Sequence, residues 1–219
     1  MPALRSFDGV YTADRAAALA GVPKSTLYYW AREQIYVPSA SPYKIKRWSF
    51  LDLLAVRAIY WLRQDKPSAA RTTMRHVRAA LEKAAEMQIP FGELNLFVDV
   101  GGRVHFRRSE RDPLQLTQGQ EVLQEPLEEL NLLTEYNVAG TWGPDLRTPK
   151  PDVRIIPGKL TGEPHVRDTR VATIELWSLV QQGFDLARIH RLYPVLADRP
   201  GALDQSISLE ERLATPTAA

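Results

Sequence analysis

The sequence predicts a mainly helical α+β protein with an N-terminal winged helix-turn-helix, a middle helix plus β-hairpin and a trihelical C-terminal domain. Two helical stretches broken by Gly21-Val22-Pro23 open the chain, alternating apolar runs surround Gly101-Gly102, and three short helical stretches follow residue 170. We expect boundaries after residues 66, 136 and 152. The stretch 137–152 is rich in Gly, Pro and Thr and is interpreted as a linker.

The first segment, residues 1–66, carries the signals of a helix-turn-helix. Thr12 is expected to cap an alanine-rich helix that ends at Gly21, and a second helix follows over 24–32. A helix, a glycine-centred turn and a helix are typical of this motif. Extended runs around a Ser/Pro tip predict a wing over 35–48, and Ser49 is expected to cap an apolar third helix.

The remaining segments alternate helices with short strands. In 67–136 we expect a helix over 68–88, a hairpin over 94–108 with a two-residue Gly-Gly turn, and an acidic helix over 118–133. The first two are the expected contacts of a homodimer. In 153–219, a strand and a polar loop should precede helices over 171–182, from Asp185 to Leu192, and from residue 200 or 201 to 213.

Composition restricts the classes of function. The 219-residue chain has 44% hydrophobic and 25% charged residues, which is typical of a globular protein. It contains no cysteine, which excludes disulfides, thiolate metal sites and cysteine nucleophiles. Since there is neither a signal-peptide core nor an apolar run of about 20 residues, we expect a cytoplasmic protein.

Charge is unevenly distributed along the chain. Residues 1–89 hold 14 Lys/Arg against 7 Asp/Glu, whereas residues 90–150 hold 6 against 10 and residues 151–219 hold 8 against 9. This asymmetry favours a polyanion as the partner of the first segment.

The residue patterns support no enzyme, cofactor or metal site. The four histidines form no HxxxH, HExxH or HxH pair, and no glycine-rich phosphate loop or Ser elbow of the GxSxG form occurs. We therefore assign no catalytic residue, cofactor or metal ligand.

Double-stranded DNA is the expected polyanion. A recognition helix places its outward residues against the major groove, while a wing reaches phosphates or the minor groove. Trp30 and Trp48 are expected in the core, and of Tyr28 and Tyr29 we expect one inside and one outside. The predicted DNA-binding residues are Lys24, Ser25, Tyr28, Tyr29, Arg32, Lys44, Lys46 and Arg47.

A resemblance supports this assignment. The run from Ala16 to Trp30, followed by Lys46-Arg47-Trp48-Ser49 and Asp52-Leu53, resembles a MerR-type winged helix over about residues 10–64. The family usually has Thr-Leu-Arg-Tyr-Tyr and an Arg-x-Tyr-Ser wing. Here Tyr28 replaces the arginine, Trp30 the second tyrosine, Lys46 the wing arginine and Trp48 the wing tyrosine.

A second resemblance covers residues 154–213. These residues resemble a homeodomain-like domain of unknown function found in VapB-type antitoxins, although Asp168 stands where the family commonly has glycine before Thr-Arg. The motifs that carry the resemblance are Ile155-Ile156-Pro157-Gly158, Gly162-Glu163-Pro164, Asp168-Thr169-Arg170-Val171, Gly183-Phe184, Ile189 and Leu192-Tyr193-Pro194.

Together the two resemblances imply the antitoxin of a type II toxin–antitoxin pair. Such a protein neutralises a PIN-domain ribonuclease toxin and represses its own operon. Because PIN ribonucleases cluster carboxylates around Mg²⁺, cations of the antitoxin are expected to oppose them, and Arg167, Arg170 and Arg212 are the candidates. The alternative is that Arg170 ties down its own loop beside Asp168.

Two other functions remain open at this point. A MerR-like regulator that responds to a small molecule would need a ligand pocket in residues 90–136. A scaffold that binds no DNA would show no salt-dependent DNA affinity.

Overall fold

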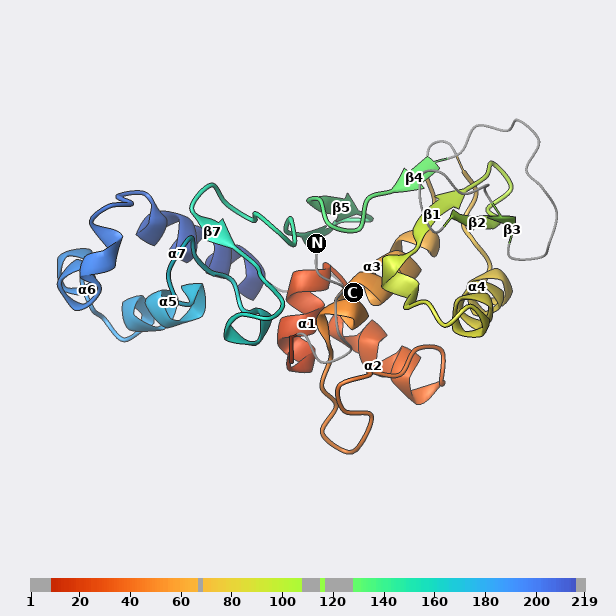
Figure 1. Cartoon of the computed structure of the whole chain (residues 1–219), viewed down its shortest axis with the longest axis horizontal. Helices are drawn as coiled ribbons and strands as arrows, with labels where there is room; N and C mark the ends of the chain where they lie inside the picture. The colour runs from red at the N-terminus through yellow and green to blue at the C-terminus, as the bar shows by residue number, and fades with distance from the viewer. Residues whose placement is uncertain (1–8, 67–68, 108–114, 117–127, 216–219) are drawn as a thin grey trace.

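The computed structural model describes residues 9–66, 69–107, 115–116 and 128–215. In this part the chain is α+β and mainly helical, as predicted, with small antiparallel sheets. The N-terminal helices lie in the centre, with the larger sheet on one side and the C-terminal helices on the other (Figure 1). No helix of the described residues has the length and apolar character needed to cross a membrane.

The helix-turn-helix forms as predicted. The Thr12 hydroxyl accepts a hydrogen bond from the backbone N–H of Arg15 and caps α1 (Ala13–Ala20), while α2 (Lys24–Arg32) follows Pro23. Gly21 ends α1 with φ 66°. A Cβ on Gly21 would lie 2.8 Å from the backbone nitrogen of Gly143, so both the left-handed backbone and the close approach of a second segment require glycine here.

The third helix, α3 (Phe50–Leu62), is the centre of the molecule. Ser49 and Asp52 form a capping box, in which each side chain accepts from the other residue's backbone N–H. Every residue of this apolar helix is buried, including the polar Asp52 and Arg57. Trp30 and Trp48 are buried beside it, which confirms their core assignment.

The middle segment contains a helix and a four-stranded antiparallel sheet in the order β3-β2-β1-β4. Its elements are α4 (Met74–Glu86), the single 3₁₀ turn η1 (Phe91–Glu93), β1 (Asn95–Val98), β2 (Val104–Arg107), β3 (Gln115–Leu116) and β4 (Glu128–Leu130). The predicted hairpin is confirmed as β1–β2, but its connection is 99–103 and is longer than two glycines. The predicted helix over 68–88 starts late, because Thr73 caps it and the backbone N–H groups of Ala70 and Thr72 donate to Val100 and Leu62.

The predicted acidic helix over 118–133 is wrong in its described part. Residues 128–130 form β4, which pairs with β1 so that Leu96 lies opposite Leu130, and residues 117–127 lie outside the described part. The helix propensity of these side chains is overridden because the backbone N–H and C=O groups at the edge of β1 need hydrogen-bond partners, and a strand supplies them.

The predicted linker over 137–152 is also wrong. Residues 136–143 form a hairpin of β5 (Tyr136–Val138) and β6 (Thr141–Gly143), and β6 packs on α1 at the Gly21 turn. Glycine and proline mark tight turns in this segment, and the side chains between them are partly buried in the main core.

The C-terminal part forms the predicted trihelical domain behind a short strand pair. Its elements are β7 (Val153–Arg154), the 3₁₀ turn η2 (Leu160–Gly162), β8 (His165–Val166), α5 (Thr173–Gln181), α6 (Leu186–Leu192), the 3₁₀ turn η3 (Pro194–Leu196) and α7 (Ala202–Ala214). Asp168 has φ 59°, a left-handed backbone conformation that favours glycine. This agrees with the glycine that is common at this position in the family that residues 154–213 resemble. The domain has its own core, but Leu209 and Leu213 of α7 belong to the main core.

Candidate nucleic-acid interface

The outward side of α2 carries all five side chains that were predicted to contact DNA. Lys24, Ser25, Tyr28, Tyr29 and Arg32 are exposed, whereas Leu27, Trp30 and Ala31 face the core. Tyr28 and Tyr29 are 46% and 48% exposed, so the prediction that one of them is buried is wrong. Leu27 and Trp30 already fill the core-facing positions, which leaves both tyrosines on the outer half of the helix.

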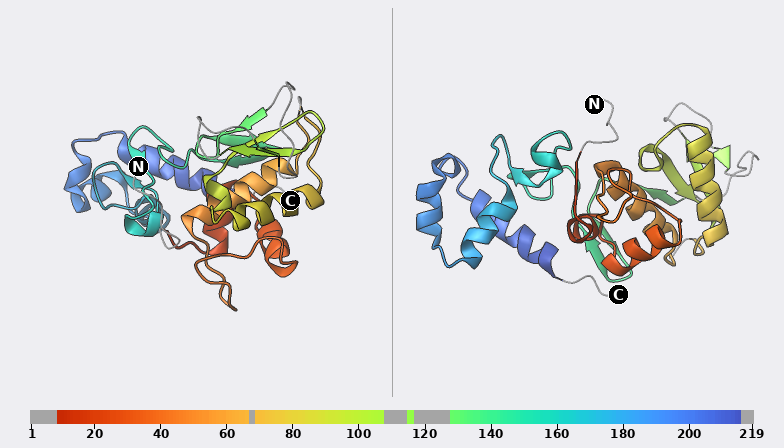
Figure 2. Two further views of the ribbon diagram at one scale, coloured as in Figure 1. Left: turned by 45° about the vertical axis from the view of Figure 1, so that its right-hand side comes forward. Right: turned by 90° about the horizontal axis from the view of Figure 1, so that it is seen from below.

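The loop over 39–47 projects from the same side of the molecule as α2 (Figures 1 and 2). Ser41 and Arg47 exchange two backbone hydrogen bonds, of 3.1 and 3.0 Å, and this bridge replaces the longer strands that a regular wing would have. At the tip, the side chains of Tyr43 and Ile45 are 79% and 66% exposed. The loop is therefore a short wing with an exposed tip, on the same side of the molecule as α2.

Asp52 of α3 holds the base of this wing. Its carboxylate accepts from the backbone N–H of Ser39 at 2.9 Å, from the Ser39 hydroxyl at 3.0 Å and from the Tyr36 hydroxyl at 2.9 Å. Burial, followed by the negative charge of Asp52, raises the pKa of Tyr36 well above its ordinary value. Since Asp52 also caps α3, this one carboxylate joins the base of the wing to the N-terminus of the central helix.

The three predicted cations of the wing differ in their surroundings. Lys44 is exposed, whereas Lys46 and Arg47 are half-buried. The Lys46 ammonium donates to the carbonyl of Pro42 at 3.1 Å, and Arg47 donates to the carbonyl of Lys46 at 3.3 Å. Lys44 is the wing residue best placed for a phosphate, while Lys46 and Arg47 also stabilise the loop.

On α2, the predicted cations form exposed ion pairs. Lys24 lies 2.6 Å from Asp14, and this hydrogen bond raises the pKa of Lys24. Arg32 lies 2.9 Å from Glu33, with its guanidinium carbon 5.6 Å from the centre of the Tyr29 ring. Exposed pairs contribute little to stability, so both cations can exchange a carboxylate for a DNA phosphate at low cost.

Sequence reasoning missed a basic flank next to α2. Arg78 of α4 donates to the carbonyl of Glu33 at 3.3 Å, just beyond the end of α2. The pKa of Arg63 is lowered, first by burial and then by the positive charge of Arg71, which places these two arginines together. Arg78 reaches the end of α2 from α4, a helix distant in the sequence, so sequence spacing carries no signal for this position.

Two arginines of the basic N-terminal segment do not contribute to this surface. Arg15 is used in an ion-pair network with Glu163 and Glu210, and Arg57 is fully buried among backbone carbonyls. The charge count of residues 1–89 therefore overstates the basic surface that α2 and the wing present.

The three arginines proposed to oppose a toxin lie apart. Arg167 pairs with Asp152 at 2.9 Å, and Arg212 lies over the Trp142 ring at 3.7 Å from its centre. Arg170 is exposed, and Asp168, the residue expected to hold it, is instead contacted by Arg199 at 3.3 Å and by Arg167 at 3.9 Å. Arg170 and Arg212 are exposed, whereas Arg167 is half-buried.

A buried histidine–aspartate pair joins the β1–β2 connection, which holds Asp99, to strand β2, which holds His105. His105 Nε2 is 3.0 Å from Asp99, which also accepts from the backbone N–H and the guanidinium of Arg103 at 2.9 and 2.6 Å. Burial favours the neutral form of Asp99, but these three hydrogen bonds outweigh it and lower its pKa. The arrangement closes a turn and leaves both side chains inaccessible to a substrate.

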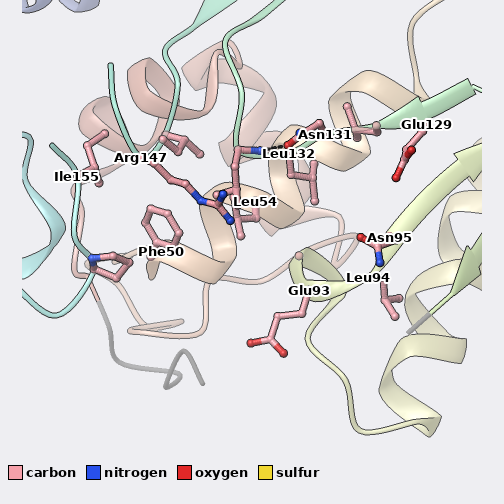
Figure 3. Close-up of a pocket in the computed structure, with 15 residues that line it drawn as sticks. Phe50, Leu54, Glu93, Leu94, Asn95, Glu129, Asn131, Leu132, Arg147 and Ile155 are labelled. Atoms are coloured by element: carbon pink, nitrogen blue, oxygen red, sulfur yellow. Dashed lines mark hydrogen bonds between the residues drawn. The ribbon is translucent and has the colours of Figure 1, made fainter. Parts of the chain in front are cut away.

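A cavity of about 590 Å³ lies between α3, the edge of the sheet and the 144–157 segment (Figure 3). It is lined by Phe50, Leu54, Gly92, Glu93, Leu94, Asn95, Glu129, Leu130, Asn131, Leu132, Leu133, Leu146, Arg147, Ile155 and Pro157. Part of the wall therefore comes from the 90–136 stretch, where a ligand-responsive regulator was expected to need a pocket. The rest of it comes from outside that stretch.

Comparison with known proteins identifies one segment. Residues 153–199 match the family DUF433, described as a protein of unknown function. Neither the curated proteins nor the solved structures contain a match to the chain. The matched residues run from β7 through η3 and, from residue 154 onward, coincide with the stretch in which the second resemblance was found.

Proposed function

We propose that this chain is the antitoxin of a type II toxin–antitoxin pair. It binds operator DNA through α2 and the 39–47 wing, represses its own operon, and neutralises a PIN-domain ribonuclease in the cytoplasm. Operators of this kind are palindromic, so the chain acts as a homodimer.

One observation carries the DNA-binding half of the proposal. The exposed face of α2 combines two cations, a hydroxyl and two half-exposed tyrosines. The wing, in which Lys44 is exposed, projects from the same side of the molecule (Figure 2). Cations and hydroxyls bind phosphates, while aromatic and polar side chains reach base edges. The arginines beside α2 extend the surface along which a DNA backbone can run.

The antitoxin half is supported by the C-terminal domain. DUF433 domains often occur in antitoxin-like proteins, and the match covers residues 153–199. Arg170 is exposed on this domain and is available to a carboxylate-rich partner.

Lys24→Ala and Lys44→Ala are each expected to weaken operator binding and to reduce its salt dependence by roughly one unit of slope, because each removes one phosphate contact. The measurement is DNA affinity at several salt concentrations. Arg191→Ala is the matched control, because Arg191 is exposed on α6, away from α2 and the wing. An unchanged slope in both lysine variants would contradict the assignment of α2 and the wing to DNA.

Capture of the full tagged chain from its native host at mild salt tests the antitoxin half. We expect a stoichiometric ribonuclease with a carboxylate metal site to be retained, and Arg170→Ala to weaken its retention. Retention of DNA alone would refute the antitoxin assignment while leaving DNA binding intact.

The cavity beside α3 favours a second candidate function, a MerR-like regulator that responds to a small molecule. Phe50 and Leu54 line the cavity, and Asp52, which lies between them on the same helix, holds the base of the wing. A molecule bound against α3 would contact the helix that positions the wing.

A further inference from the structure

The tip of the wing carries the two most exposed large hydrophobic side chains of the part that the structure describes. Tyr43 and Ile45 are 79% and 66% exposed, and the next side chain of this kind, Leu192 on α6, is 53% exposed. The exposed Lys44 stands between the two in the sequence. Because apolar side chains in water are unfavourable, two of them on one tip favour a partner that covers them.

The loop is held in a shape that keeps its tip exposed. Besides the backbone pair between Ser41 and Arg47, the Ser41 hydroxyl donates to the carbonyl of Ile45 at 3.0 Å, and the Lys46 ammonium donates to the carbonyl of Pro42 at 3.1 Å. The ring of Pro42 fixes its backbone angle φ, and Ile45, branched at Cβ, has few side-chain rotamers. The tip therefore loses little conformational entropy when a partner covers it.

The charge of the wing favours an anionic partner. Residues 39–47 contain Lys44, Lys46 and Arg47 and no Asp or Glu. Double-stranded DNA and an anionic lipid bilayer both combine a negatively charged surface with an apolar interior, which in DNA is the base stack. The wing projects from the same side of the molecule as the exposed cations, hydroxyl and tyrosines of α2, and this recognition-helix surface favours DNA (Figure 2).

We propose that the wing tip is a wedge for the minor groove of DNA. Ile45 enters between two base pairs and kinks the duplex, while α2 occupies the adjacent major groove. Tyr43 covers the deoxyribose beside the opened step, and Lys44 contacts a phosphate. The inference rests on the proposed DNA binding and adds to it the residue that bends the DNA. Because pyrimidine–purine steps unstack most easily, the wing favours a TA or CA/TG step at the position of Ile45.

A duplex labelled at both ends tests the wedge. The duplex is selected from a random pool with the full chain at mild salt, and energy transfer between its ends reports bending. We expect the full chain to raise the transfer, with a bend of roughly 20–90°. Ile45→Ala should weaken binding about tenfold and remove most of the bend at saturating protein, whereas Ile45→Leu should retain both. Leu192→Ala, at an exposed leucine of α6, is the matched control and should change neither.

A fluorescent base locates the opened step. 2-Aminopurine in place of the adenine of the TA or CA/TG step should brighten with the full chain, because the base is unstacked, and should not brighten with Ile45→Ala.

The possible outcomes separate the wedge from DNA binding itself. A pool that yields no retained duplex would overturn both. A duplex that is bound but stays straight, or that Ile45→Ala bends as the unchanged chain does, would overturn the wedge while DNA binding stands. Binding of the full chain to phosphatidylglycerol vesicles that is lost in Ile45→Ala, with DNA bending unchanged, would assign the tip to a lipid surface instead.

Discussion

Replacing Arg57 with methionine is expected to lower the free energy of unfolding by about 3 to 5 kcal/mol. The Arg57 guanidinium is fully buried, and all five of its N–H groups donate to backbone carbonyls at 2.7–3.2 Å. The acceptors are Leu19, Ala20, Leu132, Thr134 and Pro144. Methionine fills a similar volume but leaves these carbonyls buried without donors.

Arg57 carries a positive charge although its side chain is fully buried. Burial lowers its pKa to about 10, so the side chain remains protonated at neutral pH, and its guanidinium carbon lies 5.4 Å from the centre of the Tyr136 ring. The three segments that it joins are the end of α1, the stretch after β4 and the stretch after β6. Arg57 therefore connects the segment 137–152, which was predicted to be a linker, to the end of α1 in the helix-turn-helix.

Urea denaturation of the full chain measures this effect. Arg63→Met is the control, because Arg63 is half-buried and one hydrogen bond, of 2.7 Å to the carbonyl of Thr72, is expected to contribute only about 1 kcal/mol. A loss below about 1 kcal/mol in Arg57→Met would show that the carbonyls find other partners or water.

Arg15→Met is expected to cost about 3 kcal/mol, because it removes the cation that neutralises a buried carboxylate between the N-terminal module and the C-terminal domain. Arg15 holds Glu210 with two hydrogen bonds, of 2.6 and 2.9 Å, and Glu163 with a third, of 2.8 Å. The Glu210 side chain is 1% exposed and also accepts from the Thr173 hydroxyl. Without Arg15, the Thr173 hydroxyl would be the remaining donor to this carboxylate among the residues that the structure describes.

A double-mutant cycle between Arg15→Met and Glu210→Gln should give a coupling energy of about 2 kcal/mol in urea denaturation. The matched control is the pair Lys24 and Asp14, in which Asp14 is the neighbour of Arg15 on α1. Both of its side chains are exposed, and we expect it to couple by less than about 1 kcal/mol. Additive effects at Arg15 and Glu210 would mean that the two units are held mainly by other contacts, such as the 2.8 Å hydrogen bond from the Tyr11 hydroxyl to the carbonyl of Gly162.

Local chemistry made much of the fold predictable from the sequence. Thr12, Gly21, Ser49 and Asp185 mark helix ends where the structure has them, because a cap depends only on residues within one helical turn. The outward positions of α2 follow from helical spacing, with the second outward tyrosine as the exception. Helical spacing thus predicts most of the candidate DNA surface of α2.

Only the tertiary structure decided the features that depend on distant partners. Residues 128–130 became a strand because β1 presented an edge, and residues 136–143 became a packed hairpin because Gly21 allowed its close approach. Arg57, Arg15 and Arg78 are indistinguishable in sequence, yet one joins three segments, one joins two domains and one extends the basic surface. The role of a long charged side chain depends on the groups that folding places around it, and sequence spacing does not report them.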